Sequence, residues 1–456
     1  MMWLSSLLAI LALTALVFRP AWGVMGLFIV RPFVDTMWSE PVFAGLKLTE
    51  IFSGAAPLII LLHMFFPSGR DASLARMPLR WVWLTWTAYV AFFSACILYN
   101  QSVADGFNVF FRHLNGFVGF FMVQAWFAKG TRPKRFLWAL AIAGLFPMAQ
   151  GVYELATGVH WRMTLGEGNL VRNIGMYHDA ITIRYYALQT ILALLLLSAL
   201  YMKRKLLLQL LGLGYGLACA AVVQGAYSKS GALSLGSWVL LWPLLLRRVK
   251  ALAVLGVVAL GIGALYAPTI VRNVETIFHK EINAISGEDS VQRTFSGRWY
   301  TWQEMMGEWQ ELDMVQKLFG AGHMANGAHN DYLMLLFHGG IFGVALYVML
   351  LMVLSKRIAR DLWRKADPWS VAALLAMIMW LIDTIGLVPS AYSGYQWFAW
   401  GVIGLSFRIR EDALRAERAE RAERAERAER AAALASPAGL DSRGGHGLPV
   451  NILQGS

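Results

Sequence analysis

The chain has 456 residues, of which 57% are apolar and only 15% are charged, and its formal net charge is +12. Soluble domains carry charge on about 25% of their residues, so this composition excludes an ordinary soluble protein and predicts an all-α polytopic membrane protein. The basic residues fall in short clusters between apolar runs, a pattern typical of membrane topology, so we expect no nucleic-acid partner. Cys96 and Cys219 lie in apolar runs, and neither a disulfide framework nor a zinc site is predicted.

The first segment of the chain is typical of a membrane helix rather than a cleavable signal peptide. It lacks a basic start, and no small-residue cleavage site precedes the next apolar run. Residues 3–18 and 21–30 are separated by Arg19 and Pro20, and the second run is about half of the ~20 residues that a crossing needs. We therefore expect one full crossing and a partial one.

Further apolar runs bring the expected number of transmembrane helices to about 12. These runs cover residues 51–66, 81–99, 107–128, 136–155, 181–202, 206–227, 230–246, 249–270, 331–354, 369–388 and 392–407. Basic clusters occupy alternate connections, as the positive-inside rule requires of cytoplasmic ones. This orientation places both termini inside and the loops at about 156–180 and 271–330 outside.

The connection at 271–330 is long, and structureless loops of that length are usually functional or disordered. Three tryptophans and a methionine in it recur at spacings of three and four, which predicts one face of a helix: Trp299, Trp302, Met306 and Trp309. A face rich in tryptophan is typical of a helix at the boundary between membrane and water. It either anchors the loop as an aromatic belt or covers a site as a lid.

The end of this loop carries a histidine and two glycines around the start of a membrane helix. Ten residues separate His329 from Gly340, two separate Gly340 from Gly343, and Asn330 follows the histidine. Glycines let transmembrane helices approach closely, so we expect Gly340 and Gly343 to form a packing motif. The imidazole of His329 would lie where lipid meets water, within reach of a substrate anchored in the bilayer.

Several basic residues lie in or beside the outer connections, although the positive-inside rule places most Lys and Arg in cytoplasmic loops. Any one of them could pair with a carboxylate of the long loop: Glu275, Glu281, Glu288 or Asp289. Together they indicate an anionic ligand, because guanidinium groups bind phosphate oxygens at two points. We expect a lipid phosphate or pyrophosphate near Arg162, Arg172, Arg184, Lys229, Arg293 and Arg298.

Ionisable residues inside apolar runs are costly in lipid and are therefore candidates for function. Arg112 and His113 either contact substrate or extend their side chains to the outer boundary. His63 and Asp383 are expected to form hydrogen bonds between helices. His338 is either a second site residue or a buried contact between helices.

The arrangement resembles the bacterial O-antigen ligase and O-antigen polymerase superfamily of membrane glycosyltransferases. Its members share about 12 crossings, a large periplasmic loop late in the chain, and a histidine motif at the end of that loop. Here the motif is His329 and Asn330 followed by Gly340 and Gly343. The resemblance implies a fold similar to the GT-C class, with short helices in the periplasmic loop.

Three further segments carry the resemblance. The turn at 228–232 is similar to the family's Ser-Arg-x-Gly turn, with Lys229 in place of the arginine. Arg298 resembles the arginine that opens the loop helix. The segment of the earlier loop that begins at Arg172 resembles the family's glycine-containing segment.

The family implies transfer of a glycan from undecaprenyl pyrophosphate to an acceptor at the periplasmic face of the bacterial inner membrane. In the ligase branch the acceptor is a sugar of the lipid A-core oligosaccharide, in lipopolysaccharide biosynthesis. In the polymerase branch it is another lipid-linked repeat, and a third branch glycosylates protein hydroxyls. The spacing between His329 and Gly340 favours the ligase branch. The implied partners are the lipid-linked glycan, the core oligosaccharide and membrane lipids.

In this interpretation His329 takes the proton of the acceptor hydroxyl and Arg298 stabilises the departing pyrophosphate. Direct attack on the anomeric carbon predicts inversion. We expect neither a cofactor nor a metal, because arginine would replace magnesium and no Asp-x-Asp motif stands in an outer loop. The expected substrate-binding residues are Lys229, Arg172, Arg184, Arg293, His338 and Asn330.

The sequence thus predicts a transmembrane glycosyltransferase domain over 1–410 and a cytoplasmic tail over 411–456. In the tail, Ala-Glu-Arg repeats between Ala416 and Arg430 place pairs such as Glu417 and Arg421 at a favourable spacing for a solvated helix. The Gly- and Pro-rich residues after the repeats are expected to be disordered.

Overall fold

The computed structural model describes residues 2–43, 45–67, 72–165, 170–203, 205–248, 271, 275–276, 278–287, 297–324 and 327–435. The chain divides into two units, Met1–Ile409 and Arg410–Ser456. Three predictions fall outside the described residues: the crossing at 249–270, the role of Arg293, and the disordered end of the tail.

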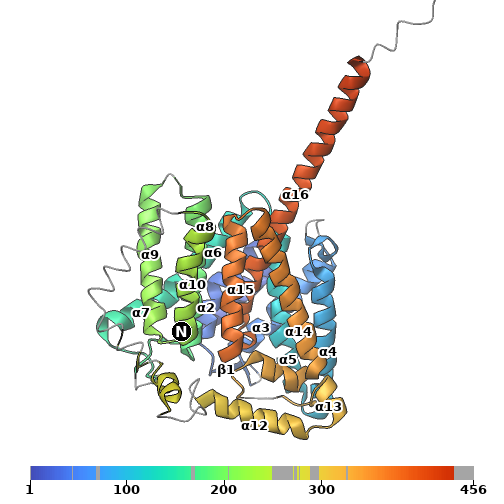
Figure 1. The fold of residues 1–456 in the computed structure, drawn as a ribbon. Coiled ribbons are helices and arrows are strands. Elements are labelled where there is room, and N and C mark those ends of the chain that lie inside the picture. Colours follow the sequence, from blue (N-terminus) through green and yellow to red (C-terminus); the bar gives the residue numbers. More distant parts are fainter. Residues whose placement is uncertain are drawn as a thin grey trace, which may run out of the picture. The chain divides into compact units, whose positions relative to one another are not determined.

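The described chain is built from helices, which confirms the prediction of an all-α membrane protein (Figure 1). A short antiparallel hairpin, β1 (Pro41–Phe43) and β2 (Leu46–Lys47), precedes the third helix. The helices are α1 (Met2–Phe18), α2 (Pro20–Asp35), α3 (Leu48–Phe65), α4 (Arg80–Asn100), α5 (Val103–Phe127), α6 (Arg132–Ala143), α7 (Leu145–Thr157), α8 (Ala180–Leu200), α9 (Leu206–Gly225), α10 (Lys229–Leu245), α12 (Arg298–Glu311), α13 (Met314–Phe319), α14 (Asp331–Arg364), α15 (Pro368–Gly386) and α16 (Ser393–Ala435).

Within the described residues, seven helical stretches are long and apolar enough to cross a membrane. The apolar runs predicted at 107–128, 230–246 and 392–407 also form helices, which are α5, α10 and the first part of α16. The number of about 12 crossings, their orientation and the periplasmic position of the long loop stay predictions. The seven stretches are Leu48–Phe65, Arg80–Asn100, Arg132–Thr157, Ala180–Leu200, Leu206–Gly225, Asp331–Arg364 and Pro368–Gly386.

The second helix differs from its prediction, because α2 continues to Asp35 beyond the apolar run that ends at residue 30. The extension is stabilised by Arg31, whose guanidinium donates to Asp35 at 2.7 Å and to Ser53 at 2.8 Å. The same carboxylate accepts hydrogen bonds from Tyr185 and Tyr186, each at 2.7 Å. An arginine whose charge is matched and whose donors are bonded can stay inside a membrane helix.

The interior between α4, α5, α15 and α16 is filled by tryptophan. Trp83 lies 5.4 Å from Trp400 between ring centroids, and Trp400 lies 4.6 Å from Trp380. Close approach of α5 to α16 depends on Gly119, where an added Cβ would lie 2.9 Å from the carbonyl oxygen of Gln396. Small residues at helix crossings and large aromatics between them give this bundle its density.

Two intramembrane polar residues behave as predicted. His63 Nε2 lies 3.1 Å from the carbonyl oxygen of Leu16, a hydrogen bond between α3 and α1. Asp383 of α15 accepts a hydrogen bond from Arg184 of α8 at 2.8 Å. Both predictions of hydrogen bonds between helices are therefore confirmed.

The long helix α14 is broken at Gly340, whose φ of 64° and ψ of −166° are not helical. The break frees backbone carbonyls, and two of them find new donors. Tyr89 Oη donates to the carbonyl of Gly339 at 2.6 Å, and the amide of Ala321 donates to the carbonyl of Phe337 at 2.7 Å. A kink in a membrane helix is tolerated when neighbours satisfy the freed groups in this way.

The two glycines of the predicted packing motif do different things. A Cβ at Gly343 would lie 3.3 Å from the ring of Tyr89, so this glycine does bring α14 close to α4. A Cβ at Gly340 would lie 2.4 Å from the backbone of Leu318, before the end of α13. Gly340 therefore breaks the backbone of α14 and lets it approach the short loop helix α13 closely.

In the tail, residues 410–435 continue as the second part of α16, as predicted for the repeat. Ion pairs with the expected four-residue spacing join Glu420 to Arg424, Glu423 to Arg427 and Glu426 to Arg430. All these side chains are largely exposed, and each such pair contributes about 0.3–0.5 kcal/mol at most.

We expect Gly340→Ala to lower the thermal stability of the purified protein. A side chain is strained at positive φ and would collide with the backbone of Leu318, at a cost of about 1–3 kcal/mol. Gly307→Ala in α12 is the matched control, since nothing lies within 4 Å of an added Cβ there. Equal melting temperatures for Gly340→Ala and wild type would contradict this account of the break.

Candidate functional site

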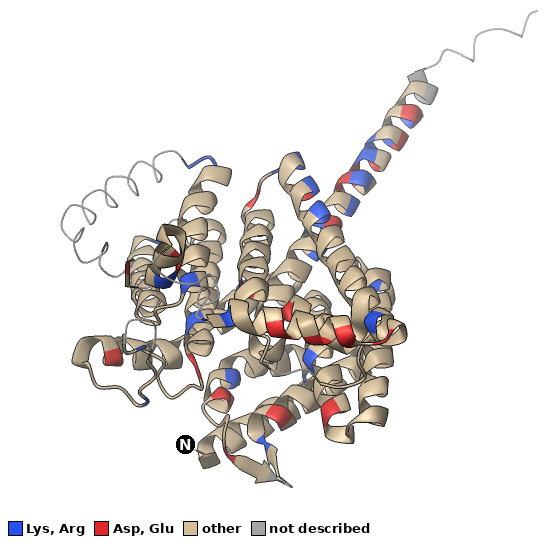
Figure 2. Cartoon of the chain, turned by 60° about the horizontal axis from the view of Figure 1, so that its bottom comes forward, with Lys and Arg blue, Asp and Glu red and all other residues tan. Residues whose placement is uncertain are grey.

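Arg298, the first residue of α12, lines a cavity of about 800 Å³. Figure 1 shows that α12 crosses one end of the bundle. Helices α5, α8, α10, α12, α14 and α15 and the loops between them contribute to the lining of the cavity. Figure 2 brings this end forward and shows basic and acidic residues around it. The charged and polar residues of the lining are Arg112, Arg172, His178, Asp179, Tyr227, Ser228, Lys229, Ser230, Glu281, Arg298, His329 and Tyr392.

Four of the described helices begin at this cavity: α8, α10, α12 and α14. Residues at or just before their first turns line it, namely Asp179, Ser228, Arg298 and His329. The amino-terminal end of a helix carries a partial positive charge of roughly +0.5, from aligned peptide dipoles and unpaired amide groups. Side chains cap three of these ends: Asp179 on α8, Ser228 on α10 and Asn330 on α14. The carboxylate of Asp179 already matches the positive end of α8. The uncapped start of α12, at Arg298, therefore adds most to the positive side chains in favouring an anion.

His329 occupies a strained backbone position just before α14. Its φ of 44° lies in the left-handed region, and the buried Ala328 precedes it. His329 is exposed, but loss of hydration against the surrounding residues lowers its pKa, the positive charge of Arg298 lowers that pKa further, and the negative charge of Asp179 opposes the shift. The imidazole is therefore neutral at pH 7 and able to accept a proton.

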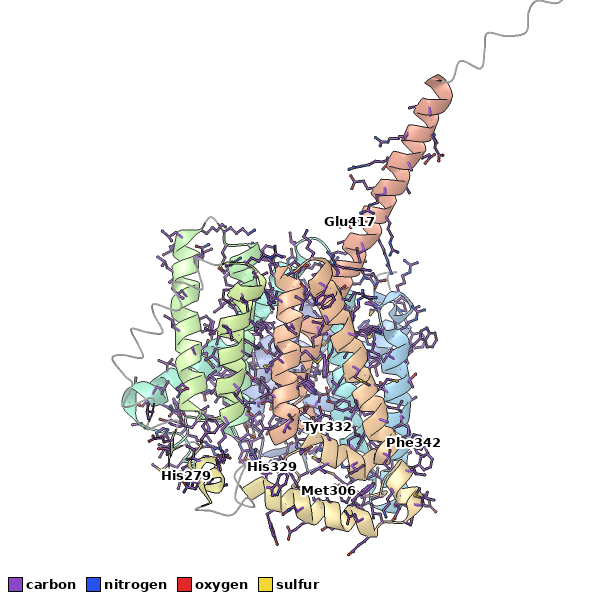
Figure 3. The ribbon with its side chains drawn as sticks, viewed as in Figure 1. His279, Met306, His329, Tyr332, Phe342 and Glu417 are labelled. Carbon is purple, nitrogen blue, oxygen red and sulfur yellow. The ribbon has the colours of Figure 1, made fainter. Side chains whose placement is uncertain are left out.

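Arg298 opens α12 and lines the cavity beside His329. Its guanidinium donates a hydrogen bond to the carbonyl oxygen of Gly386, at the end of α15. The helix that follows is fixed to the histidine loop, because Trp302 Nε1 donates to the carbonyl of Ala328 at 2.6 Å. Figure 3 shows α12, marked by Met306, at the same end of the bundle as His329.

The predicted helix around the tryptophans is confirmed as α12. Met305 is its buried residue and packs with Ala328, Met334 and Phe337, whereas Trp299 is exposed. The acidic residues of α12 lie on its exposed side (Figure 2). The helix packs on the loop that carries His329, and its role as a lid or as an aromatic belt stays a prediction.

Lys229 is the first residue of α10, and its ammonium group is already paired. Both carboxylate oxygens of Glu281 accept hydrogen bonds from Lys229 Nζ, at 2.7 and 2.8 Å. The same nitrogen lies 5.2 Å from the ring centroid of Phe278. An anion that binds Lys229 would therefore share it with Glu281 or displace that carboxylate.

Arg184 does not line the cavity but lies directly behind it, with none of its surface exposed. It donates to Asp383 at 2.8 Å, to Ser228 at 2.7 Å and to Ser230. Gly231 makes this possible, because a Cβ there would lie 2.5 Å from Arg184 Cδ. The guanidinium thus fixes the turn that presents Lys229 and is a support for the site rather than a part of its surface.

Arg172 reaches the cavity from the loop between α7 and α8. Two residues of α7 hold this loop: Glu154 accepts from the amide of Gly175 at 3.0 Å, and Gln150 accepts from the amide of Met176 at 2.8 Å. Gly175 has a φ of 61° and fits tightly over Gln150. The described part of this loop is in this way fixed by buried side chains.

The remaining predicted site residues lie apart from the cavity surface. Asn330 caps α14, its side-chain oxygen accepting from the amides of Tyr332 and Leu333, and it donates to the carbonyl of Ile385 at 3.1 Å. His338 is 1% exposed and stacks near Phe93 at a centroid distance of 6.5 Å. Neither residue is part of the cavity lining.

Sequence reasoning missed Asp179 and Tyr392. Asp179 caps α8 through the amides of Ile181 and Thr182, each at 3.0 Å, and it accepts a hydrogen bond from the hydroxyl of Tyr392. Burial would raise the pKa of Asp179, but the hydrogen bonds to its carboxylate, with the nearby His178, keep that pKa below the ordinary value. The only signal in the sequence is an aspartate before an apolar run, which indicates a cap and nothing more.

For Arg112 the sequence allowed either contact with substrate or extension of the side chain to the outer boundary. In the structure Arg112 lines the cavity. Its guanidinium lies 3.9 Å from the sulfur of Met334. Asp331, two residues after His329, is buried and accepts a hydrogen bond from the hydroxyl of Ser390 at 2.6 Å. Among the described residues, no group of three or more His, Cys, Asp or Glu side chains is arranged to hold a metal ion.

Comparison with protein-family models gives no match, and comparison with the curated proteins gives none either. The functional interpretation therefore depends on the site itself and on the resemblance of its motifs.

The neighbours of His329 predict opposite effects on its titration. Arg298→Gln removes a positive charge and should raise the pKa of His329, whereas Asp179→Asn removes a negative charge and should lower it. Both can be measured by NMR titration of histidine-labelled full-length protein. Arg162→Gln is the control, because Arg162 donates to the carbonyl of Tyr177 and does not line the cavity. A pKa that is the same in all four proteins would contradict this electrostatic description.

Proposed function

We propose that this chain is an O-antigen ligase, a membrane glycosyltransferase that moves a glycan from undecaprenyl pyrophosphate to the lipid A-core oligosaccharide. The observation that carries the proposal is the meeting of His329, Arg298 and Lys229 with four helix amino termini in one cavity. This combination suits a diphosphate next to a hydroxyl that must lose a proton. The resemblance of the motifs to the ligase and polymerase superfamily supports the same substrate class.

The positive groups are suited to the leaving group. Pyrophosphate departs with growing negative charge, and preorganised donors at such a position contribute about 2.7–4 kcal/mol each in other enzymes. Arg298, Lys229 and Arg172 line the cavity and can take this part. Arg112 adds a fourth cation from α5.

His329 is the proposed general base. The oxygen of the acceptor hydroxyl forms a bond to the anomeric carbon while the bond from that carbon to the phosphate oxygen breaks. The hydroxyl proton passes to the imidazole, and the electron pair leaves with undecaprenyl pyrophosphate. A single displacement of this kind inverts the anomeric configuration, and a positioned base contributes roughly 10²–10⁴ in rate.

The place of the cavity fits a lipid-linked donor. It lies at the end of apolar helices, and its lining includes Leu233, Ile382 and Ile385 beside the cations. A phosphate head group can enter the polar part while the polyprenyl chain stays in the bilayer. We propose that this end faces the periplasm and that the chain lies in the bacterial inner membrane.

The central test is transfer in vitro with full-length protein, an undecaprenyl-pyrophosphate glycan and a lipid A-core acceptor. His329→Ala should lower the rate about 10²–10⁴-fold, because the acceptor hydroxyl loses its base. Product is measured as a shift of the core lipid on a gel.

His279→Ala is the matched control, since His279 lies on another segment and does not line the cavity (Figure 3). Equal transfer by His329→Ala and wild type would remove the histidine from the mechanism. Extension of the donor onto itself would identify a polymerase, and transfer to a protein hydroxyl would identify an oligosaccharyltransferase.

We also expect transfer without a divalent cation, because arginine and lysine occupy the part that magnesium takes in many sugar-nucleotide enzymes. EDTA should leave the rate unchanged within about twofold of the untreated enzyme, a change worth about 0.4 kcal/mol. Loss of transfer in EDTA, restored by magnesium or manganese alone, would show that a metal is required.

A further inference from the structure

The turn between α5 and α6 holds a second group of cations, far from the cavity. Helix α5 passes the cavity at Arg112 and ends at Phe127, about 22 Å further along at 1.5 Å per residue. The turn that follows surrounds an open hollow of about 450 Å³. The described lining of this hollow carries three cations and no carboxylate: Lys129, Gly130, Thr131, Arg132 and Arg135.

The basic residues of this turn lie at the amino terminus of α6, where positive charge destabilises a helix. The amino terminus of α6 is its positive end, where acidic residues stabilise and basic residues destabilise a helix. Its first turn has no acidic residue, and Thr131 makes no capping hydrogen bond with its side chain. Arg132 instead stands at the first helical position and Arg135 one turn later. An anion in the hollow would offset the positive end of the α6 dipole beside Arg132 and Arg135.

A buried acceptor lies next to these cations. A small space of about 10 Å³, enough for one oxygen-sized group, is shared by Lys129, Arg132, Arg408 and Gln124. Gln124 is 2% exposed, and among the described residues its Oε1 has no hydrogen-bond partner. Buried oxygens are rarely left in that state, so a donor such as a hydroxyl group is expected there. Arg408, 4% exposed, adds a further positive charge behind this space.

We propose that this turn binds the head group of an anionic phospholipid that carries a free hydroxyl, with the phosphate in the hollow. Lys129, Arg132 and Arg135 surround the phosphate, and the hydroxyl reaches Gln124. A lipid fits better than a free anion, because the turn directly precedes Arg132–Thr157, a stretch long and apolar enough to cross a membrane, and the ends of such stretches are where head groups are met. Basic pockets between membrane helices are suited to such lipids. This site does not depend on the proposed transfer reaction.

The test uses purified full-length protein in a neutral detergent. Thermal unfolding is followed while phosphatidylglycerol is added, and phosphatidylcholine and inorganic phosphate are added in parallel. We expect saturable stabilisation by phosphatidylglycerol alone. The double variant Arg132→Gln/Arg135→Gln should bind it about 30-fold more weakly, since each basic residue near a membrane surface contributes roughly fivefold.

The matched control is Lys356→Gln/Arg360→Gln, which removes two exposed cations from α14. This variant should bind the lipid as wild type does. Equal weakening by the two double variants would overturn the proposal, because the effect would then come from surface charge in general. Stabilisation by inorganic phosphate with none by phosphatidylglycerol would also overturn it and identify a site for small anions.

Discussion

A buried ion pair, Arg184 with Asp383, holds together the helices on which the candidate site depends. It joins α8 to α15, and through Ser228 and Ser230 it also holds the start of α10. Burying two charges is costly, and the cost is offset only when the remaining donors and acceptors are bonded. Here Tyr395 donates to the same Asp383 oxygen at 2.7 Å, whereas the other oxygen of Asp383 and the Nε of Arg184 have no hydrogen-bond partner among the described residues. Loss of either partner would leave a bare charge in the interior, at a cost of about 3–5 kcal/mol. Loss of Arg184 would also release the turn that carries Lys229.

The cations of the cavity are held in place by partners that a ligand could replace. Glu281 pairs with Lys229, and the carbonyl of Gly386 accepts from Arg298. A bound pyrophosphate would replace the Glu281 and Gly386 oxygens with its own. The cations are therefore already held in position before the ligand binds. Such exchange lowers the gain from each contact but keeps the groups in the geometry that a transition state needs.

The sequence predicts the helices well because apolar runs and basic clusters are local signals. It also brings His329, Arg298, Lys229 and Arg172 to one site, since all four stand at the ends of predicted helices or loops. Two pairings could not be predicted, because the partners are distant in the chain. Arg184 and Asp383 are 199 residues apart, and Asp179 and Tyr392 are 213 residues apart. No pattern within a short stretch of sequence indicates which distant residues form a pair.

The same limit applies to backbone geometry. A glycine in an apolar run predicts close packing, and only the neighbouring α13 shows that Gly340 is a break. The extension of α2 likewise depends on Arg31, whose bonds reach α3 and lie beside those from α8. Intramembrane charges are thus the places where a hydropathy profile and the folded chain differ most.

The four helix amino termini at the cavity have a consequence for how freely this site can drift in evolution. Their positive potential comes from peptide groups. It therefore does not titrate, and it does not depend on which side chains the gene encodes. A lineage can exchange one basic side chain for another, or lose one for a time, while part of the attraction for an anion is kept by the fold. Related chains are therefore expected to share helix starts at this cavity more faithfully than they share the identities of its cations.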